Sequence, residues 1–124
     1  MATSKVNRQF RTSISNDTEI PPVSIPDNTF TTLATFSPPD NGIYILETDM
    51  AFAAGTGNRI LLVDTFETNN NNAANSVLAE GRATLQKIRF FRLNTTEAVY
   101  IRAYQNSGAA MSVRGNYRWL KVGN

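Results

Sequence analysis

Apolar and polar residues alternate along much of the chain, which predicts short β-strands. Successive side chains of a strand point to opposite faces, so one face of the segment 43–52 is expected to be buried. That face carries Tyr44, Leu46, Thr48, Met50 and Phe52. The segment 98–104 alternates as cleanly, and its inner face is expected to carry Val99, Ile101 and Ala103.

Other segments differ in how many of their faces are apolar. Residues 59–66 are apolar on both faces, so this strand is expected to be covered on both sides. Three prolines within residues 20–28 exclude a helix and favour an extended segment at a sheet edge. Residues 30–36 are β-branched and aromatic. Residues 117–122 are expected to be the closing strand, with their tyrosine and tryptophan in the core.

Residues 77–88 are the ambiguous part of the pattern. Four aliphatic side chains in this segment also fit the apolar stripe of a helix. Gly81 in the middle and the two phenylalanines that follow favour strand instead. The alternation slips between Leu85 and Ile88, which predicts a β-bulge or a bend there.

About eight short strands, joined by turns rich in glycine, proline and asparagine, predict an all-β protein. Spacing of this kind is typical of an antiparallel β-sandwich or jelly roll. At 124 residues and 13.7 kDa, the chain has the size of a single domain. We expect residues 1–20 to form an N-terminal arm or a weak first strand, and residues 21–124 to form the jelly-roll domain.

Composition narrows the chemistry that such a domain performs. The chain has no cysteine and no histidine, which removes disulfides, thiol nucleophiles and the side chain most used as a general acid or base. No phosphate-binding loop, nucleophile elbow or paired catalytic carboxylate is evident, so we expect neither enzyme activity nor a cofactor. The acidic residues lack the spacing of a calcium loop, and no metal site is expected.

The net charge of +2 is unevenly distributed. Residues 1–67 contain four Lys and Arg against eight Asp and Glu, whereas residues 68–124 contain eight against two. The basic residues stand singly among apolar ones, so we expect them to pair with the acidic half across strands and expect no nucleic-acid partner. The mean hydropathy of −0.28 predicts that the protein does not insert into a membrane. Residues 1–11 are charged and lack a continuous apolar stretch, so no secretory signal peptide is expected.

Several segments match, in order and spacing, the strands of a known family. Residues 41–50 resemble the P-G-x-Y-x-F strand of C1q-like globular heads, and Phe30–Leu33 resembles the F-x-x-L strand before it. Residues 85–104 are similar to the family's L-x-L-x-x-G-D-x-V-x-L strands, with Thr96-Glu97-Ala98 in place of the Gly-Asp. Residues 115–120 are similar to the closing F-x-G-x-L-L strand.

This resemblance spans about residues 28–122 and lacks the collagen-like Gly-X-Y stem, so no complement-type role is expected. It implies a ten-stranded jelly roll of the C1q/TNF-like kind that packs as a trimer around a threefold axis. Similar trimeric heads occur on bacteriophage tail fibres, baseplates and capsid surfaces.

If the family's strand order holds, the strands 43–52 and 98–104 and the closing strand lie in the sheet that faces the threefold axis. Acidic residues of the first strand would then lie opposite Arg102 and Arg118. The expected subunit interface comprises Ile43, Ile45, Glu47, Asp49, Tyr100, Arg102, Tyr104 and Arg118. Soluble monomers rarely leave outward isoleucines and tyrosines uncovered. The alternative is that all eight are ordinary exposed residues whose pairs contribute less than about 1 kcal/mol.

Ligand recognition by such a head is expected in its loops. The asparagine run in residues 69–75 and the turn 105–108 concentrate amides and hydroxyls, which suit neutral sugar hydroxyls because they both donate and accept hydrogen bonds. The candidate binding residues are Asn70, Asn72, Gln105 and Asn106. Solvated turns without a binding role have the same composition, so that alternative stays open.

The leading hypothesis is a non-enzymatic virion surface protein that is made in the host cytoplasm. It would be the homotrimeric attachment head of a phage fibre or baseplate, in contact with other virion proteins and with a host surface glycan. One alternative is a purely structural decoration or connector trimer whose residues 1–20 dock onto a larger assembly. The other is a carbohydrate-binding module at a bacterial cell surface.

Overall fold

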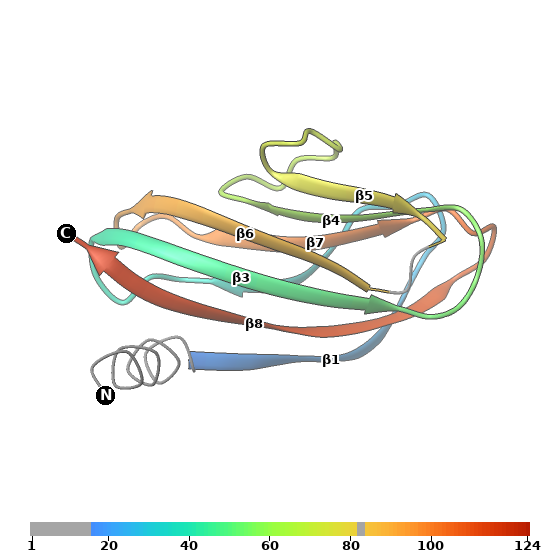
Figure 1. The fold of residues 1–124 in the computed structure, drawn as a ribbon, viewed down its shortest axis with the longest axis horizontal. Helices are drawn as coiled ribbons and strands as arrows, with labels where there is room; N and C mark the ends of the chain where they lie inside the picture. Colours follow the sequence, from blue (N-terminus) through green and yellow to red (C-terminus); the bar gives the residue numbers. More distant parts are fainter. Residues whose placement is uncertain (1–15, 82–83) are drawn as a thin grey trace, which may run out of the picture.

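The chain forms two facing antiparallel sheets (Figure 1). The computed structural model describes residues 16–81 and 84–124, in which there are eight strands and no helix, hence none long and apolar enough to cross a membrane. The strands are β1 (Asn16–Ile25), β2 (Thr31–Phe36), β3 (Gly42–Phe52), β4 (Asn58–Asp64), β5 (Ser76–Glu80), β6 (Thr84–Leu93), β7 (Val99–Gln105) and β8 (Met111–Gly123). The predicted antiparallel β-sandwich is confirmed, with eight strands in the described ranges where the resemblance implies ten.

The strands pair in a nested order, like a long hairpin that has been rolled up. β1 pairs with β8, β2 with β7, β3 with β6 and β4 with β5, always antiparallel. Sheet A has the order β1-β8-β3-β6, and sheet B has the order β2-β7-β4-β5. Two four-stranded sheets in this order are the arrangement of a jelly roll.

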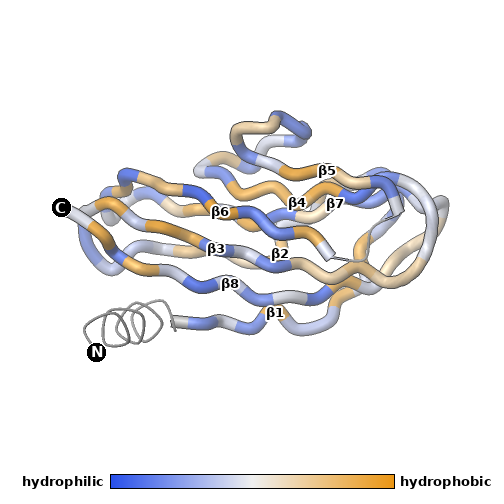
Figure 2. Tube along the Cα trace, in the orientation of Figure 1, coloured by the Kyte–Doolittle hydropathy of each residue, from blue (hydrophilic) through white to orange (hydrophobic). Residues whose placement is uncertain are grey.

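The core lies between the sheets, where the alternation predicts it. The even-numbered side chains of β3 from Tyr44 to Phe52 are buried, and the odd-numbered ones are partly exposed. β4 is buried on both faces, as its apolar pattern predicts. Hydrophobic and hydrophilic positions alternate along the strands in Figure 2. The predicted inner side chains of β7, those of Val99, Ile101 and Ala103, are fully buried.

Three aromatic rings from different strands pack together at the edge of this core. The ring centroid of Trp119 is 5.2 Å from that of Phe36 and 5.7 Å from that of Tyr44. The Tyr44 hydroxyl lies 2.7 Å from Asp40 Oδ1, which also pairs with Lys121 Nζ at 3.2 Å. Burial, with the bond to Asp40, raises the pKa of Tyr44. The bonds from Tyr44 and Lys121 lower the pKa of Asp40. The expected core position is confirmed for Tyr117, whereas Trp119 is partly buried and packs against the core.

Residues 77–80 lie in β5 and residues 84–88 in β6, so strand is confirmed over helix for these residues, but the predicted bulge is wrong. β6 pairs with β3 along its whole length without a register shift. The alternation continues because Lys87 and Arg89 face inward at the open side of the sandwich, where backbone carbonyls of sheet B and its loops accept their hydrogen bonds at 2.9 and 2.7 Å. Ile88 and Phe90 therefore face outward, with 48% and 63% exposure.

β1 begins before the expected domain boundary at residue 20. It lies at an edge of sheet A, so residues 16–20 belong to the sandwich. Its register shifts between Ile20 and Val23, where the two prolines stand, which confirms the extended edge segment. Residues 1–15 of the expected arm lie outside the described residues.

Candidate functional site

The strands expected to share one interface sheet lie in two different sheets. β3 is flanked by β8, as expected, and by β6 on its other side. β7 lies in sheet B between β2 and β4, so the expected placement of residues 98–104 beside residues 43–52 is wrong. The physical reason is that β6 supplies an unbroken ten-residue partner for β3, whereas β7 is a central strand of the opposite sheet. Side chains thereby separated from β3 are those of Tyr100, Arg102 and Tyr104.

Arg118 gathers the acidic side chains on the outer face of sheet A. Its guanidinium donates to the carboxylate of Glu47, its register partner, and to Asp49 Oδ2 at 3.2 Å. Arg118 Nε lies 3.5 Å from Asp17 Oδ1. Burial acts to lower the pKa of Arg118, but the three carboxylates outweigh it and the pKa is raised. The predicted pairing with Arg118 is confirmed, and the predicted pairing with Arg102 is wrong because Arg102 lies on sheet B.

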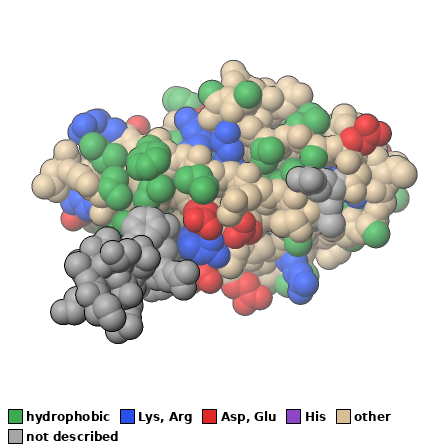
Figure 3. All heavy atoms as spheres, in the orientation of Figure 1, with side chains coloured by type: hydrophobic (Ala, Val, Ile, Leu, Met, Phe, Trp, Pro, Cys, Tyr) green, Lys and Arg blue, Asp and Glu red, His purple; other side chains and the backbone are tan. Residues whose placement is uncertain are grey.

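Beside this cluster lies an apolar area that we call the sheet A patch. It consists of Ile43, Ile45, Ile88, Phe90 and Leu120. Ile45 is the register partner of both Phe90 and Leu120, so the patch crosses three strands. Hydrophobic side chains gather over β3, β6 and β8, next to a group of acidic and basic ones (Figure 3).

The exposed apolar area of the patch is on the order of 300 Å², which is the size of the largest, often functional patches on monomeric proteins. Sequence reasoning identified Ile43 and Ile45 but missed Ile88 and Phe90. The inward Lys87 and Arg89 hid them, because alternation with charged residues normally assigns the apolar partners to the core.

On the outer face of sheet B, the chain covers itself. Arg102 is only 7% exposed, and its guanidinium pairs with Glu67 Oε2 at 3.1 Å and donates to Asn69 Oδ1 at 2.7 Å. Both partners belong to the connection between β4 and β5, so these bonds hold residues 65–75 against the sheet. Leu62 faces outward beside Arg102 and is nevertheless fully buried. The polar contacts of Arg102 are thus made within its own chain.

Two of the expected ligand-binding residues serve the turn after β7 instead. Gln105 is fully buried, donates to the carbonyl oxygen of Ala109 at 2.8 Å and accepts from the backbone nitrogen of Ser107 at 2.8 Å. Its side chain is therefore committed to this turn and presents no surface to a ligand. The side-chain oxygen of Asn106 accepts the backbone N–H of Asn58. Amide side chains replace missing backbone partners in turns, and composition alone does not reveal this use.

The other two expected residues shape the asparagine-rich segment 69–75, which we call the asparagine loop. Asn70 Oδ1 accepts from the backbone nitrogen of Asn72 at 3.1 Å, and Asn72 Oδ1 accepts from that of Ala74 at 2.8 Å. Asn70 also lines a hollow, whereas Asn72 does not. The oxygens of both amides are thus occupied by turns of the loop itself.

We call this concavity the sheet B hollow. Its volume is about 280 Å³, and its lining comes from the outer face of sheet B and from the asparagine loop. The rings of Phe30 and Tyr104 pack together with centroids 4.7 Å apart. The Tyr104 hydroxyl donates to Asn28 Oδ1 at 3.0 Å. The lining consists of Phe30, Asn58, Ile60, Asn69, Asn70, Asn71, Leu78 and Tyr104.

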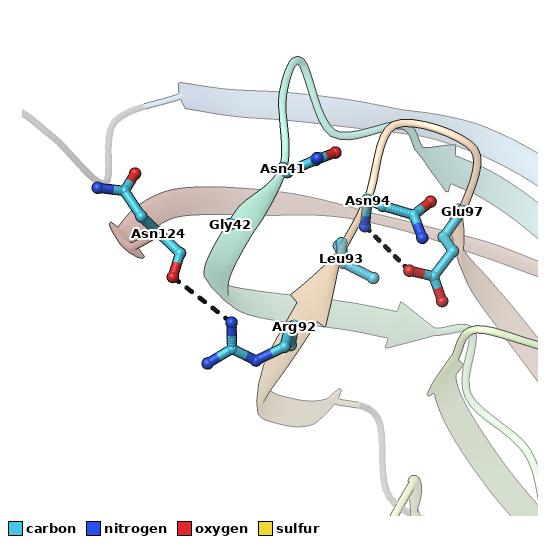
Figure 4. A pocket seen from close by; sticks show the side chains of 7 residues that line it. All are labelled: Asn41, Gly42, Arg92, Leu93, Asn94, Glu97 and Asn124. Carbon is cyan, nitrogen blue, oxygen red and sulfur yellow. Dashed lines mark hydrogen bonds between the residues drawn. The ribbon is translucent and has the colours of Figure 1, made fainter.

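A second hollow, of about 340 Å³, lies at the end of the sandwich that holds the C-terminus (Figure 4). Arg92 donates to the backbone oxygen of Asn124 at 3.4 Å. The carboxylate of Glu97 accepts the backbone N–H of Asn94 at 2.9 Å, and the Asn41 side chain accepts that of Thr95 at 3.0 Å. Most of the polar groups here cap the turn between β6 and β7.

Arg59 is the buried polar residue that sequence reasoning missed. It is fully buried and donates to four carbonyl oxygens, those of Ala53, Gly55, Thr56 and Gly57, at 2.9 to 3.1 Å. Within the described ranges, no carboxylate pairs with it. The available signal was the glycine-rich segment that immediately precedes it. Arg59 organises the connection between β3 and β4.

The acidic side chains are also candidate ligands for a metal ion. In residues 16–81 and 84–124, no group of three or more Asp and Glu side chains is placed to hold a metal ion.

No protein-family model matches the chain, and no match is found among curated proteins.

Proposed function

We propose that this protein is a non-enzymatic binding head that assembles as a homotrimer through the outer face of sheet A. The sheet A patch is the observation that carries the proposal. Phe90, on the edge strand β6, is 63% exposed, and covering it removes about 130 Å² of apolar surface from water, which stabilises an assembly by about 3 kcal/mol per subunit.

The charges around the patch favour a second copy of this chain as the occupant. Three carboxylates surround the single guanidinium of Arg118, which leaves an excess of negative charge on one flank. Arg92 lies on the other side, opposite Ile43 in the register, and is exposed. Rotation about an axis brings the basic flank of one copy to the acidic flank of the next, which is the head-to-tail contact of a closed ring.

The attachment role at a virion surface is supported by the resemblance of residues 28–122 to C1q-like heads. A purely structural trimer would use the same interface and differ in having no ligand. A demonstrated ligand site would therefore distinguish the two functions, whereas the oligomeric state would not.

The assembly is tested by sedimentation velocity and light scattering on the full chain and on Phe90→Ser. The wild type is expected to have three times the mass of the 13.7 kDa chain, and Phe90→Ser is expected to be a folded monomer. Phe66→Ser is the matched control, because Phe66 is similarly exposed, at 68%, and lies outside the patch. A wild type that stays monomeric at all concentrations would exclude the proposal.

A variant that lacks residues 1–15 tests whether the chain's own N-terminal segment covers the patch. If the patch binds another copy, this variant remains a trimer. A truncated protein that assembles while the full chain is monomeric would show that residues 1–15 occupy the patch.

A further inference from the structure

We infer that the sheet B hollow binds a neutral saccharide. The inference deepens the proposed function, on which it rests for its biological role, because it gives the binding head a ligand class and a place to bind it. The hollow lies on the sheet opposite to the proposed assembly face, so binding and assembly do not compete for the same residues.

An apolar wall forms one side of the hollow. Phe30 and Tyr104 are half-buried and present packed aromatic rings, and Leu78 is 41% exposed beside them. Ile60 is the register partner of both Tyr104 and Leu78, so three strands contribute to one continuous surface. The C–H face of a pyranose ring packs favourably on such aromatic rings because its hydrogens meet the negative ring face.

Amide groups form the opposite side. Asn69, Asn70 and Asn71 are all exposed in the loop above the rings. The oxygens of Asn69 and Asn70 are engaged by Arg102 and by the loop backbone, which leaves their NH₂ groups to donate outward. The side chain of Asn71 makes no hydrogen bond in the described part of the chain, so both its donor and acceptor are available. Sugar hydroxyls accept and donate, and match this rim.

The lining is uncharged, which favours a neutral ring-shaped ligand over a charged one. None of the eight lining side chains carries a charge. The nearby guanidinium of Arg102 is buried and paired with Glu67. A nucleotide or phosphosugar would find no cation to pair with its phosphate, and a carboxylated sugar would likewise be unpaired. The volume of about 280 Å³ is near the lower limit for small-molecule sites, which suits one or two sugar rings.

Both walls are held in place before any ligand binds. The Tyr104 hydroxyl is fixed by Asn28, and the asparagine loop is fixed by the bond from Arg102 to Asn69. Ordering these groups in advance lowers the entropy that binding would otherwise cost.

The test is an NMR titration of the full-length protein with the methyl glycosides of glucose, galactose, mannose and N-acetylglucosamine. Adenosine monophosphate and N-acetylneuraminic acid serve as charged probes. The expected result is that at least one neutral glycoside shifts the resonances of Phe30, Tyr104 and the asparagine loop, and that neither charged probe does.

Variants locate the site. Tyr104→Ala is expected to weaken binding by about tenfold or more, whereas Tyr104→Phe keeps the ring and binds within about threefold of the wild type. Asn71→Ala weakens binding without changing the fold, because its side chain has no other partner in the described part of the chain. Tyr100→Ala is the matched control, since Tyr100 lies on the same face of β7 outside the lining and its loss leaves binding unchanged.

Failure of this inference is distinguishable from failure of the proposed function. A trimer that binds none of the glycosides, or binds adenosine monophosphate in preference, overturns the saccharide site and leaves the binding head standing. Binding that survives Tyr104→Ala also overturns it. A monomer that binds a glycoside through Tyr104 confirms the site and overturns the trimeric head.

Discussion

Removing the guanidinium of Arg102 is expected to release the asparagine loop from sheet B. Arg102 lies in the centre of the outer face and holds the loop through Glu67 and Asn69, while Thr32 donates to the same Glu67 carboxylate at 2.9 Å. Arg102→Met retains most of the side-chain volume and removes the guanidinium's contacts to Glu67 and Asn69, while the bond from Thr32 to Glu67 is left in place. The substitution thus tests the contribution of the hydrogen bonds to stability apart from that of side-chain packing.

The magnitude follows from the exposure of each partner. Glu67 is 56% exposed, so its ion pair contributes less than about 1 kcal/mol. The guanidinium also donates to Thr32 Oγ1, and its bonds to Thr32 and Asn69 contribute about 1 kcal/mol each, because both partners regain water when the loop leaves. Partial exposure of the fully buried Leu62 adds up to about 1 kcal/mol. The expected loss of unfolding free energy is about 2–3 kcal/mol.

Urea unfolding followed by the fluorescence of Trp119 measures this loss, and amide hydrogen exchange of residues 65–75 reports on the loop. Arg114→Met is the matched control, since Arg114 is exposed and its substitution is expected to change stability by less than about 0.5 kcal/mol. Arg102→Lys keeps the charge but loses the forked geometry and is expected to lie between the two. If Arg102→Met unfolds at the same urea concentration as the control and the loop stays protected, the loop is held by something other than this residue.

Three further substitutions test the interior. Burial raises the pKa of Tyr44. The stability that its buried neutral hydroxyl contributes is complete below the ordinary pKa of about 10 and is lost as the pH rises through the folded-state pKa. Tyr44→Phe should therefore flatten the alkaline side of the stability profile, measured by thermal melting at a series of pH values. Gly115→Ala places a Cβ 2.0 Å from the backbone oxygen of Asp49, so the β3–β8 pairing must open and urea unfolding should show a loss of about 3 kcal/mol or more. Arg59→Met leaves four loop carbonyls without their donor and should cost about 3 kcal/mol in the same assay, with a loss under about 1 kcal/mol contradicting the role given to it.

The sequence predicts which face of a strand is buried more reliably than it predicts which strand is the neighbour. β3 and β7 alternate with period two, and their inner faces follow directly from that pattern. The pattern carries no information on register partners far along the chain, and so β7 was expected beside β3 although β6 is there. β6 was harder because Lys87 and Arg89 reach backbone oxygens between the sheets while Phe90 faces outward.

The candidate sites show the same limit. The loop around Asn70 could be chosen from its amide content, and it does line a hollow. Gln105 has the same chemistry but points into the core, where it closes a turn. Tyr104 was expected at the axis, and the structure places it against Phe30, a contact between residues 74 positions apart that no local pattern predicts.

The uneven charge of the two halves has its explanation in the nested strand order. Rolling up a hairpin brings the beginning of a chain to its end, and the acidic half to the basic half. Every ion pair within the described ranges joins an acid from residues 1–67 to a base from residues 68–124. The pairs are Asp64 with Arg89, Glu67 with Arg102, Asp40 with Lys121, and Asp17, Glu47 and Asp49 with Arg118. The charge separation along the sequence is therefore largely neutralised inside one chain. Arg92 and Arg114 have no carboxylate partner in the described part of the chain, and Arg92 lies beside the sheet A patch, where the proposed trimer would bring the acidic flank of a neighbouring copy.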